Sequence, residues 1–183
     1  MKTNRLSKTL TSAMNGQMTK EAHASQIYLS YAAWADNQGF CGMANFLFRH
    51  AQEERNHMMK ILEYILKRGA EAEVIAIPTP HEKPKSLFSC FEKIFEHEVE
   101  NTKSVYKLVK MSFEEEDWGT WNFLQWFVKE QIEEETMALG LLDKIKIAGG
   151  ENISHNALYI FDKDMLGTSS EVKSALEATT DNP

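Results

Sequence analysis

The nine-residue run HAQEERNHM, from His50 to Met58, contains three side chains that bind metal ions well. Glu53 and Glu54 are adjacent carboxylates, and His57 follows Glu54 by three residues. In an α-helix this spacing places Glu54 and His57 on one face, where both can reach the same ion. The same residues would also suit the charged face of a surface helix. The choice depends on the elements that hold them and on what the remaining chain contributes.

Four long segments show the apolar spacing of helices, and no strand-like alternation competes with them. The predicted helices cover about residues 5–36, 41–68, 87–115 and 118–147. NQGF supplies a short break between the first and second helices, and DWGT supplies one between the third and fourth. AGG ends the fourth helix. A short fifth helix is expected after Ser154, reaching about Leu166.

The segment between the second and third helices, residues 70–86, decides the topology. It contains three of the four prolines and can span roughly 55 Å at about 3.3 Å per residue. The second helix is only roughly 42 Å long at about 1.5 Å per residue, so the segment can run the full length of a bundle. We therefore predict an all-α fold: a four-helix bundle with a long crossover that leaves helices two and three parallel. Residues 1–166 form one domain, and residues 167–183 form a polar tail.

Each helix carries an apolar stripe that is interrupted near its middle by a glutamate. These four residues fall in one layer whichever way the helices run: Glu21, Glu54, Glu98 and Glu134. A single glutamate on such a stripe is more often a solvated surface group, and His57 alone would more often be a core imidazole. Four coincident midpoints without Lys or Arg on the stripes favour bound cations, because isolated buried carboxylates are costly. Carboxylates with one imidazole and no thiolate suit iron or manganese better than zinc.

Composition limits the classes of partner. The formal net charge of −7 disfavours nucleic acid and suits cations. There is no apolar run long enough to cross a bilayer and no secretory signal pattern, so we expect a cytoplasmic protein without membrane contact. Cys41 and Cys90 lack metal-site or redox spacing, which is compatible with two reduced thiols.

At this point the residues resemble a known family, the bacterial non-haem ferritins. The resemblance covers about residues 5–166 and rests on QMTKEAHASQIYL, RHAQEERNHM, FEHEVE, WNFLQWFVKEQIEEE and ALYIFDKDML. It implies that the first iron is held by Glu21, Glu54 and His57. It also implies that the second iron is held by Glu54, Glu98 and Glu134, with Gln131 alongside and Tyr28 beside the centre. Glu54, which is central in the layer, is then the bridge between the two ions.

Three further glutamates each precede a stripe residue by one position: Glu53, Glu130 and Glu133. Spacing alone favours a solvated flank, whereas the resemblance implies that they form a third iron site together with Glu134. His50, on the same stripe as His57, is expected to be a hydrogen-bonded core imidazole or a group that supports the site. The fourth helix lacks a second Glu-x-x-His motif, which argues against bacterioferritin, so no haem is expected.

The resemblance implies an iron-storage ferroxidase that oxidises Fe(II) with O₂ or H₂O₂ and forms a hollow homo-oligomeric shell of twenty-four subunits. Two alternatives stay open. One is a metal-binding bundle without turnover, against which the presence of Glu98 argues. The other is a peroxide-detoxifying protein that uses the same site.

Overall fold

The computed structural model describes residues 4–80 and 82–166. Its four long helices are α1 (Lys8–Asn37), α2 (Cys41–Lys67), α3 (Leu87–Glu114) and α4 (Trp118–Ile147). A short 3₁₀ turn, η1 (Gly150–Asn152), leads to a further helix over residues 155–166. No strand occurs in the described residues, and no helix among them is both long and apolar enough to cross a membrane. The all-α prediction is confirmed, while the proposed tail, residues 167–183, lies outside the described residues.

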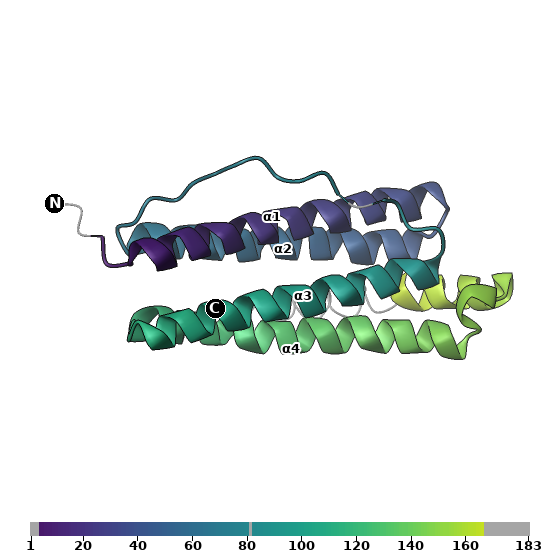
Figure 1. Cartoon of the computed structure of the whole chain (residues 1–183). Helices are drawn as coiled ribbons and strands as arrows, with labels where there is room; N and C mark the ends of the chain where they lie inside the picture. Colours follow the sequence, from purple (N-terminus) through teal and green to yellow (C-terminus); the bar gives the residue numbers. More distant parts are fainter. Residues whose placement is uncertain (1–3, 81, 167–183) are drawn as a thin grey trace, which may run out of the picture.

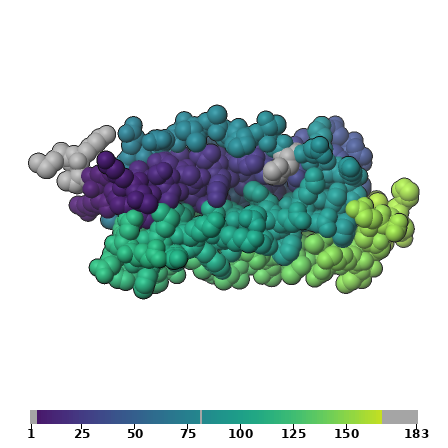
Figure 2. All heavy atoms as spheres, in the orientation of Figure 1, coloured from purple at the N-terminus to yellow at the C-terminus, as the bar shows by residue number. Residues whose placement is uncertain are grey.

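The helices form two antiparallel pairs, α1 with α2 and α3 with α4, which stack on each other (Figure 1). The crossover leaves the end of α2, runs along the outer side of the α1–α2 pair and reaches the start of α3 at the opposite end of the bundle (Figure 1). Figure 2 shows this segment lying against α1 along most of its length. Helices α2 and α3 therefore run in the same direction, as the length of the crossover predicted.

The ends of the helices have local causes. Ser7 caps α1, because its hydroxyl oxygen accepts from the backbone N–H of Leu10 at 3.0 Å, so α1 begins at Lys8 instead of near residue 5. Ser86 with Ser89 forms a capping box for α3. Asp117 caps α4 through the N–H of Thr120. The turns after α1 and α2 contain glycines with positive φ, Gly39 at 84° and Gly69 at 76°.

Helix α2 is capped from a distance. Its N-cap residue, Phe40, offers no side-chain acceptor, and Asp162 of the last helix supplies one instead. Oδ1 of Asp162 accepts from the backbone N–H of Met43 at 2.8 Å. Gly42 makes this approach possible, since a Cβ atom at that position would lie 1.9 Å from the carbonyl oxygen of Asp162. The last helix is thus docked on the start of α2 by a backbone contact that only glycine permits.

The interior of the bundle contains two separate apolar clusters with polar residues between them. One cluster lies toward the end that holds the α1–α2 turn, and its largest fully buried side chains are Tyr28, Tyr31, Phe91, Ile27, Met43, Leu47 and Ile94. The other lies toward the opposite end, with Phe127, Leu10, Met14, Ile61 and Ile65. On every helix the midpoint glutamate falls between the residues of the two clusters.

Both cysteines are free. Cys41 is exposed at the start of α2, and Cys90 is buried in the first apolar cluster. Burial raises the pKa of the Cys90 thiol well above its usual value, so it is not a reactive thiolate at neutral pH.

Gly42→Ala should undock the last helix, because the added methyl group cannot coexist with the carbonyl of Asp162 at 1.9 Å. We expect a loss of roughly 1–3 kcal/mol in unfolding free energy, as for other overpacked sites. Proteolysis within residues 155–166 should also become faster. Gly16→Ala is the matched control: Gly16 is helical, and nothing lies within 4 Å of the position of its added Cβ. That change should stabilise by roughly 0.5–1 kcal/mol. Equal stability of the two variants would show that the docking contact is unimportant.

Candidate metal centre

Five ionisable groups from four helices meet in the polar layer between the apolar clusters. Glu21 comes from α1, Glu54 and His57 from α2, Glu98 from α3 and Glu134 from α4, and all five are between 0% and 7% exposed. The buried residues of the described chain include no Lys or Arg. The carboxylates therefore face one another without a cationic side chain to balance them, an arrangement that is unfavourable unless protons or metal ions are taken up.

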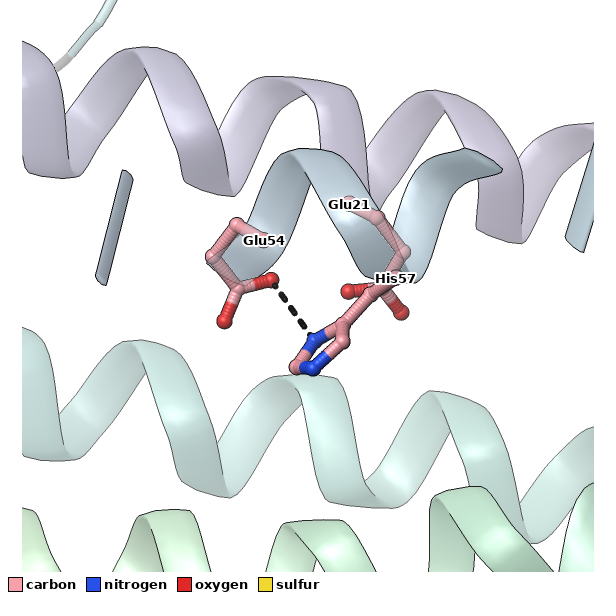
Figure 3. A group of neighbouring side chains, drawn as sticks. All are labelled: Glu21, Glu54 and His57. Carbon is pink, nitrogen blue, oxygen red and sulfur yellow. Dashed lines mark ion pairs between the residues drawn. The ribbon is translucent and has the colours of Figure 1, made fainter. Parts of the chain in front are cut away.

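One potential binding group lies between α1 and α2. Carboxylate oxygens of Glu21 and Glu54 and a ring nitrogen of His57 lie within 4.8 Å of one another. Figure 3 shows the side chains of Glu54 and His57 leaving α2 on the same side, with the carboxylate of Glu21 close to the imidazole. Nδ1 of His57 lies 3.5 Å from Oε2 of Glu54, and this oxygen accepts no hydrogen bond from the described residues. A buried carboxylate oxygen without a donor is suited to a cation.

Glu98 is held from two sides. The hydroxyl of Tyr28 donates to its Oε1 at 2.7 Å, and Nε2 of Gln131 donates to its Oε2 at 3.4 Å and to its backbone carbonyl at 3.3 Å. Tyr28 and Gln131 are themselves almost fully buried. The two residues that the resemblance placed beside the centre therefore fix the orientation of the Glu98 carboxylate.

Burial and mutual repulsion raise the pKa values of the carboxyl groups in this layer. Burial, with smaller contributions from the charges of Glu21 and Glu135, raises the pKa of Glu98 to about 7 despite the hydrogen bonds that it accepts. Burial and then the charge of Glu98 raise the pKa of Glu134 to about 8. The pKa of Glu54 is raised well above its usual value by burial, then by Glu21 and Glu98. Near neutral pH the layer thus holds protons that a divalent cation would displace.

A second group lies beside the first, closer to solvent. Carboxylate oxygens of Glu53, Glu130 and Glu134 lie within 4.8 Å of one another. The side chain of Glu53 is 46% exposed and that of Glu130 is 18% exposed. Oε1 of Glu130 also lies 3.6 Å from Nε2 of His57. His57 therefore stands between the two groups, with one ring nitrogen facing each.

Glu133, the remaining candidate for a third site, does not join this group. Its side chain is 61% exposed and pairs with Nζ of Lys129 at 3.4 Å. The structure thus brings together three of the four residues that the resemblance assigned to a third site, and it leaves Glu133 on the surface. All of the assignments to metal binding remain predictions.

His50 differs from an ordinary core histidine. Neither ring nitrogen forms a hydrogen bond with the described residues, although Nδ1 lies 3.5 Å from Oε2 of Glu53. The ring packs against Phe46, with centroids 4.1 Å apart, and against Tyr28 at 5.6 Å. Burial, with smaller effects from Arg49 and His57, lowers the pKa of His50 to about 4, so the imidazole is neutral at pH 7. Of the two expectations, a group adjoining the site fits better than a hydrogen-bonded core imidazole.

Two buried amides in contact with the layer were not among the predicted site residues. Nε2 of Gln17 donates to Oε1 of Glu21 at 2.6 Å, and Nδ2 of Asn101 donates to Oε2 of the same carboxylate at 3.4 Å. A signal for both existed in the sequence: Gln17 precedes Glu21 by four residues, and Asn101 follows Glu98 by three, the spacings that place side chains together on a helix.

The chain is similar to known proteins over most of its length. The family model described as Ferritin-like domain matches residues 11–148. A probable bacterial non-heme ferritin-like protein of Haemophilus influenzae is 41% identical over 160 residues, which cover 87% of this chain and 95% of that protein. The bacterial non-heme ferritin of Campylobacter jejuni is 39% identical over 158 residues, which cover 86% of this chain and 93% of that protein. A solved structure of an open pore ferritin from the archaeon Archaeoglobus fulgidus gives a TM-score of 0.85 at 35% identity, covering 89% of this chain and 98% of that one.

The raised pKa values predict that the metal-free protein loses stability as the pH rises from about 6.5 to 9. In this range the unfolded carboxyl groups are fully ionised, whereas the folded protein still binds protons at Glu98, Glu134 and Glu54. Each unit by which folding raises a pKa corresponds to about 1.4 kcal/mol of unfolding free energy that is lost when the group ionises. Below pH 6.5 the unfolded chain binds a proton at His50 that the folded protein does not, which makes stability rise with pH and opposes the effect of the carboxyl groups. The predicted range therefore starts at about pH 6.5. Thermal unfolding at several pH values tests the prediction.

Glu98→Gln should reduce this loss of stability, because the amide cannot ionise. We expect the variant to be more stable than the parent at pH 9 and to lose that advantage at pH 6. Glu114→Gln serves as a control, since the Glu114 side chain is 60% exposed and only pairs with Lys110. A flat pH profile for the parent protein would contradict the proposed electrostatics of the layer.

Proposed function

Because this chain belongs to the ferritin-like family, we propose that it is an iron-storage protein that oxidises Fe(II) at the buried carboxylate layer. The observation that carries the proposal is the convergence of Glu21, Glu54, Glu98 and Glu134 with His57, without any Lys or Arg among the buried residues described. Two divalent ions would balance four carboxylates. Hard oxygen donors with one imidazole suit iron and also stabilise its ferric form.

The ligands divide between two positions. Glu21, Glu54 and His57 would hold the first Fe(II), in the group where their ligand atoms already lie within 4.8 Å of one another. Glu54, Glu98 and Glu134 would hold the second, so that Glu54 bridges the two ions. Tyr28 and Gln131 donate to Glu98 at 2.7 and 3.4 Å and would keep its carboxylate oriented for the second ion.

The reaction needs an acceptor for two electrons. Two Fe(II) become two Fe(III), and the electrons reduce O₂ with two protons to H₂O₂, or reduce H₂O₂ with two protons to two molecules of water. The carboxyl groups that carry protons near neutral pH would release them when the metal binds, because the ions displace those protons. Glu53, Glu130 and Glu134 would form a more solvated third position, which would bind a further ion more weakly than the paired site.

Storage requires a compartment, which we propose is a hollow shell of twenty-four copies in the cytoplasm. Large apolar side chains on the outer surface support self-association: Val74 and Ile75 of the crossover are 84% and 58% exposed, and Ile147 at the end of α4 is 88% exposed. Val74 and Ile75 are neighbours in the crossover, whereas Ile147 lies at the other end of the bundle, so contacts with other copies would cover exposed apolar groups at both ends.

The first test of this proposal is the size of the native particle. Sedimentation velocity at micromolar concentration should give one species with the mass of twenty-four chains of 21.0 kDa. After addition of Fe(II) in air, the same particle should sediment faster, because mineral inside the shell adds mass. Only monomers or dimers, or an unchanged sedimentation coefficient after iron loading, would refute storage in a shell.

The second test separates the paired site from the third position. Glu54→Ala should lower the initial rate of Fe(II) oxidation by roughly 100-fold or more, since even groups that only support a ligand commonly account for about 10- to 100-fold. Glu53→Ala should leave the first turnover nearly unchanged, because Glu53 belongs only to the more exposed group. It should instead change the number of Fe(II) oxidised per O₂ and slow later turnovers.

Stopped-flow absorbance with an oxygen electrode compares the two variants, with Glu63→Ala as the control because the Glu63 side chain is 58% exposed, pairs with Lys67 and belongs to neither group. Repeating the reaction with H₂O₂ in place of O₂ shows which oxidant is preferred. If Glu53→Ala and Glu54→Ala lose the first turnover equally, the division into a paired site and a third position is wrong.

A further inference from the structure

Three buried amide side chains form a continuous connection across the polar layer. Gln17 comes from α1, Asn101 from α3 and Gln131 from α4, and each is at most 5% exposed. They run from Glu21, on the first iron position, to Glu98, on the second. Buried amides are retained in a core only when their donors and acceptors are satisfied, so their partners identify what they orient.

Both oxygens of Glu21 accept from this connection. Gln17 donates to Oε1 at 2.6 Å, and Asn101 donates to Oε2 at 3.4 Å. Gln17 is itself oriented from outside, because the hydroxyl of Ser104 donates to its Oε1 at 2.6 Å and leaves its Nε2 facing inward. Each oxygen of the Glu21 carboxylate therefore accepts a hydrogen bond, and the carboxylate cannot rotate without losing one of them.

Asn101 is the residue that touches both halves of the layer. Its Oδ1 accepts from Gln17 at 2.7 Å, and its Nδ2 donates to Glu21 at 3.4 Å and to Oε1 of Gln131 at 3.3 Å. Gln131 in turn donates to Glu98. Only one orientation of the Asn101 amide satisfies these partners: a flip would set its NH₂ against the NH₂ of Gln17 and its oxygen against the Glu21 carboxylate.

We propose that Asn101 is a positioning residue that fixes Glu21 relative to Gln131 and Glu98, so that the two metal positions form as a pair. The inference rests on the proposed function, since it concerns how the same centre binds its two ions. Without Asn101, Glu21 loses the donor on Oε2, and Gln17 and Gln131 each lose a partner. Binding at the first position then weakens, and the orientation of Glu21 no longer depends on the α4 side of the centre.

The test uses zinc, which binds such ligands without redox chemistry and so reports on positioning alone. Calorimetric titration of the assembled, iron-free protein at pH 7 should show two Zn²⁺ per chain at the buried centre. Asn101→Leu, which has the same branched shape but no polar atoms, should weaken binding of the first ion roughly 10-fold or more, as expected for a lost hydrogen bond to a charged group. If Asn101→Leu does not yield a folded assembly, Asn101→Ser carries the same comparison.

Two controls separate positioning from general damage. Asn15 is another buried amide, bonded to backbone groups of Thr11, Glu71 and Glu73, so Asn15→Leu should lower thermal stability without changing zinc affinity. In a Glu21→Gln background, adding Asn101→Leu should weaken zinc binding by less than twofold, because Asn101 acts through Glu21.

The outcomes are distinguishable. If the parent protein binds no pair of ions, the proposed function itself fails. If the parent binds two ions and Asn101→Leu binds them with affinities within twofold of the parent, the role of Asn101 is refuted. An equal loss in the parent and Glu21→Gln backgrounds also refutes it, because the amide would then act independently of Glu21.

Discussion

The electrostatic cost of four carboxylates in one buried layer determines much of what surrounds them. Each carboxyl group loses its hydration and lies near others of the same charge, and the buried residues described contribute no cationic side chain. Without metal, carboxyl groups of the layer retain protons near neutral pH, because the pKa values of Glu54, Glu98 and Glu134 are raised. Neutral groups, namely the buried amides and the hydroxyl of Tyr28, also donate hydrogen bonds to the carboxylates. The site is thus prepared for positive charge without containing any of its own.

The two apolar clusters allow the bundle to tolerate such a layer. Each cluster packs one end of all four helices, so the hydrophobic stabilisation of the fold does not depend on the middle. The residues of the polar layer lie within about two turns of each helix, where they face one another. Side-chain rings at the boundary, such as Phe127 and Tyr28, belong to an apolar cluster and also contact the layer. The fold and the site therefore meet at a small number of shared residues.

Much of this arrangement could be predicted from periodicity alone. The apolar stripes place the helices within a few residues of their observed ends, and they identify the four glutamates and His57 as inward-facing, because a helix repeats every 3.6 residues.

Positions one residue off a stripe are harder to judge. Glu130 turns toward His57 while Glu133 turns to solvent, a difference set by the rotation of α4. The helical spacings from Glu21 and Glu98 point to Gln17 and Asn101, but amides carry no charge that demands a partner, so spacing alone does not separate them from solvated polar residues. The contact between Asp162 and Gly42 joins distant segments, so no local pattern predicts it.

The division of the proposed ligands between the two helical pairs has a thermodynamic consequence. Glu21, Glu54 and His57 belong to α1 and α2, whereas Glu98 and Glu134 belong to α3 and α4. A pair of ions that shares ligands from both sides binds only while the two hairpins are docked, so by mass action it acts as a clamp on the docked state. Any fluctuation that separates the hairpins must first release metal. A bound pair of ions would then also be a cross-link within the chain, strongest when the supply of the ion is greatest.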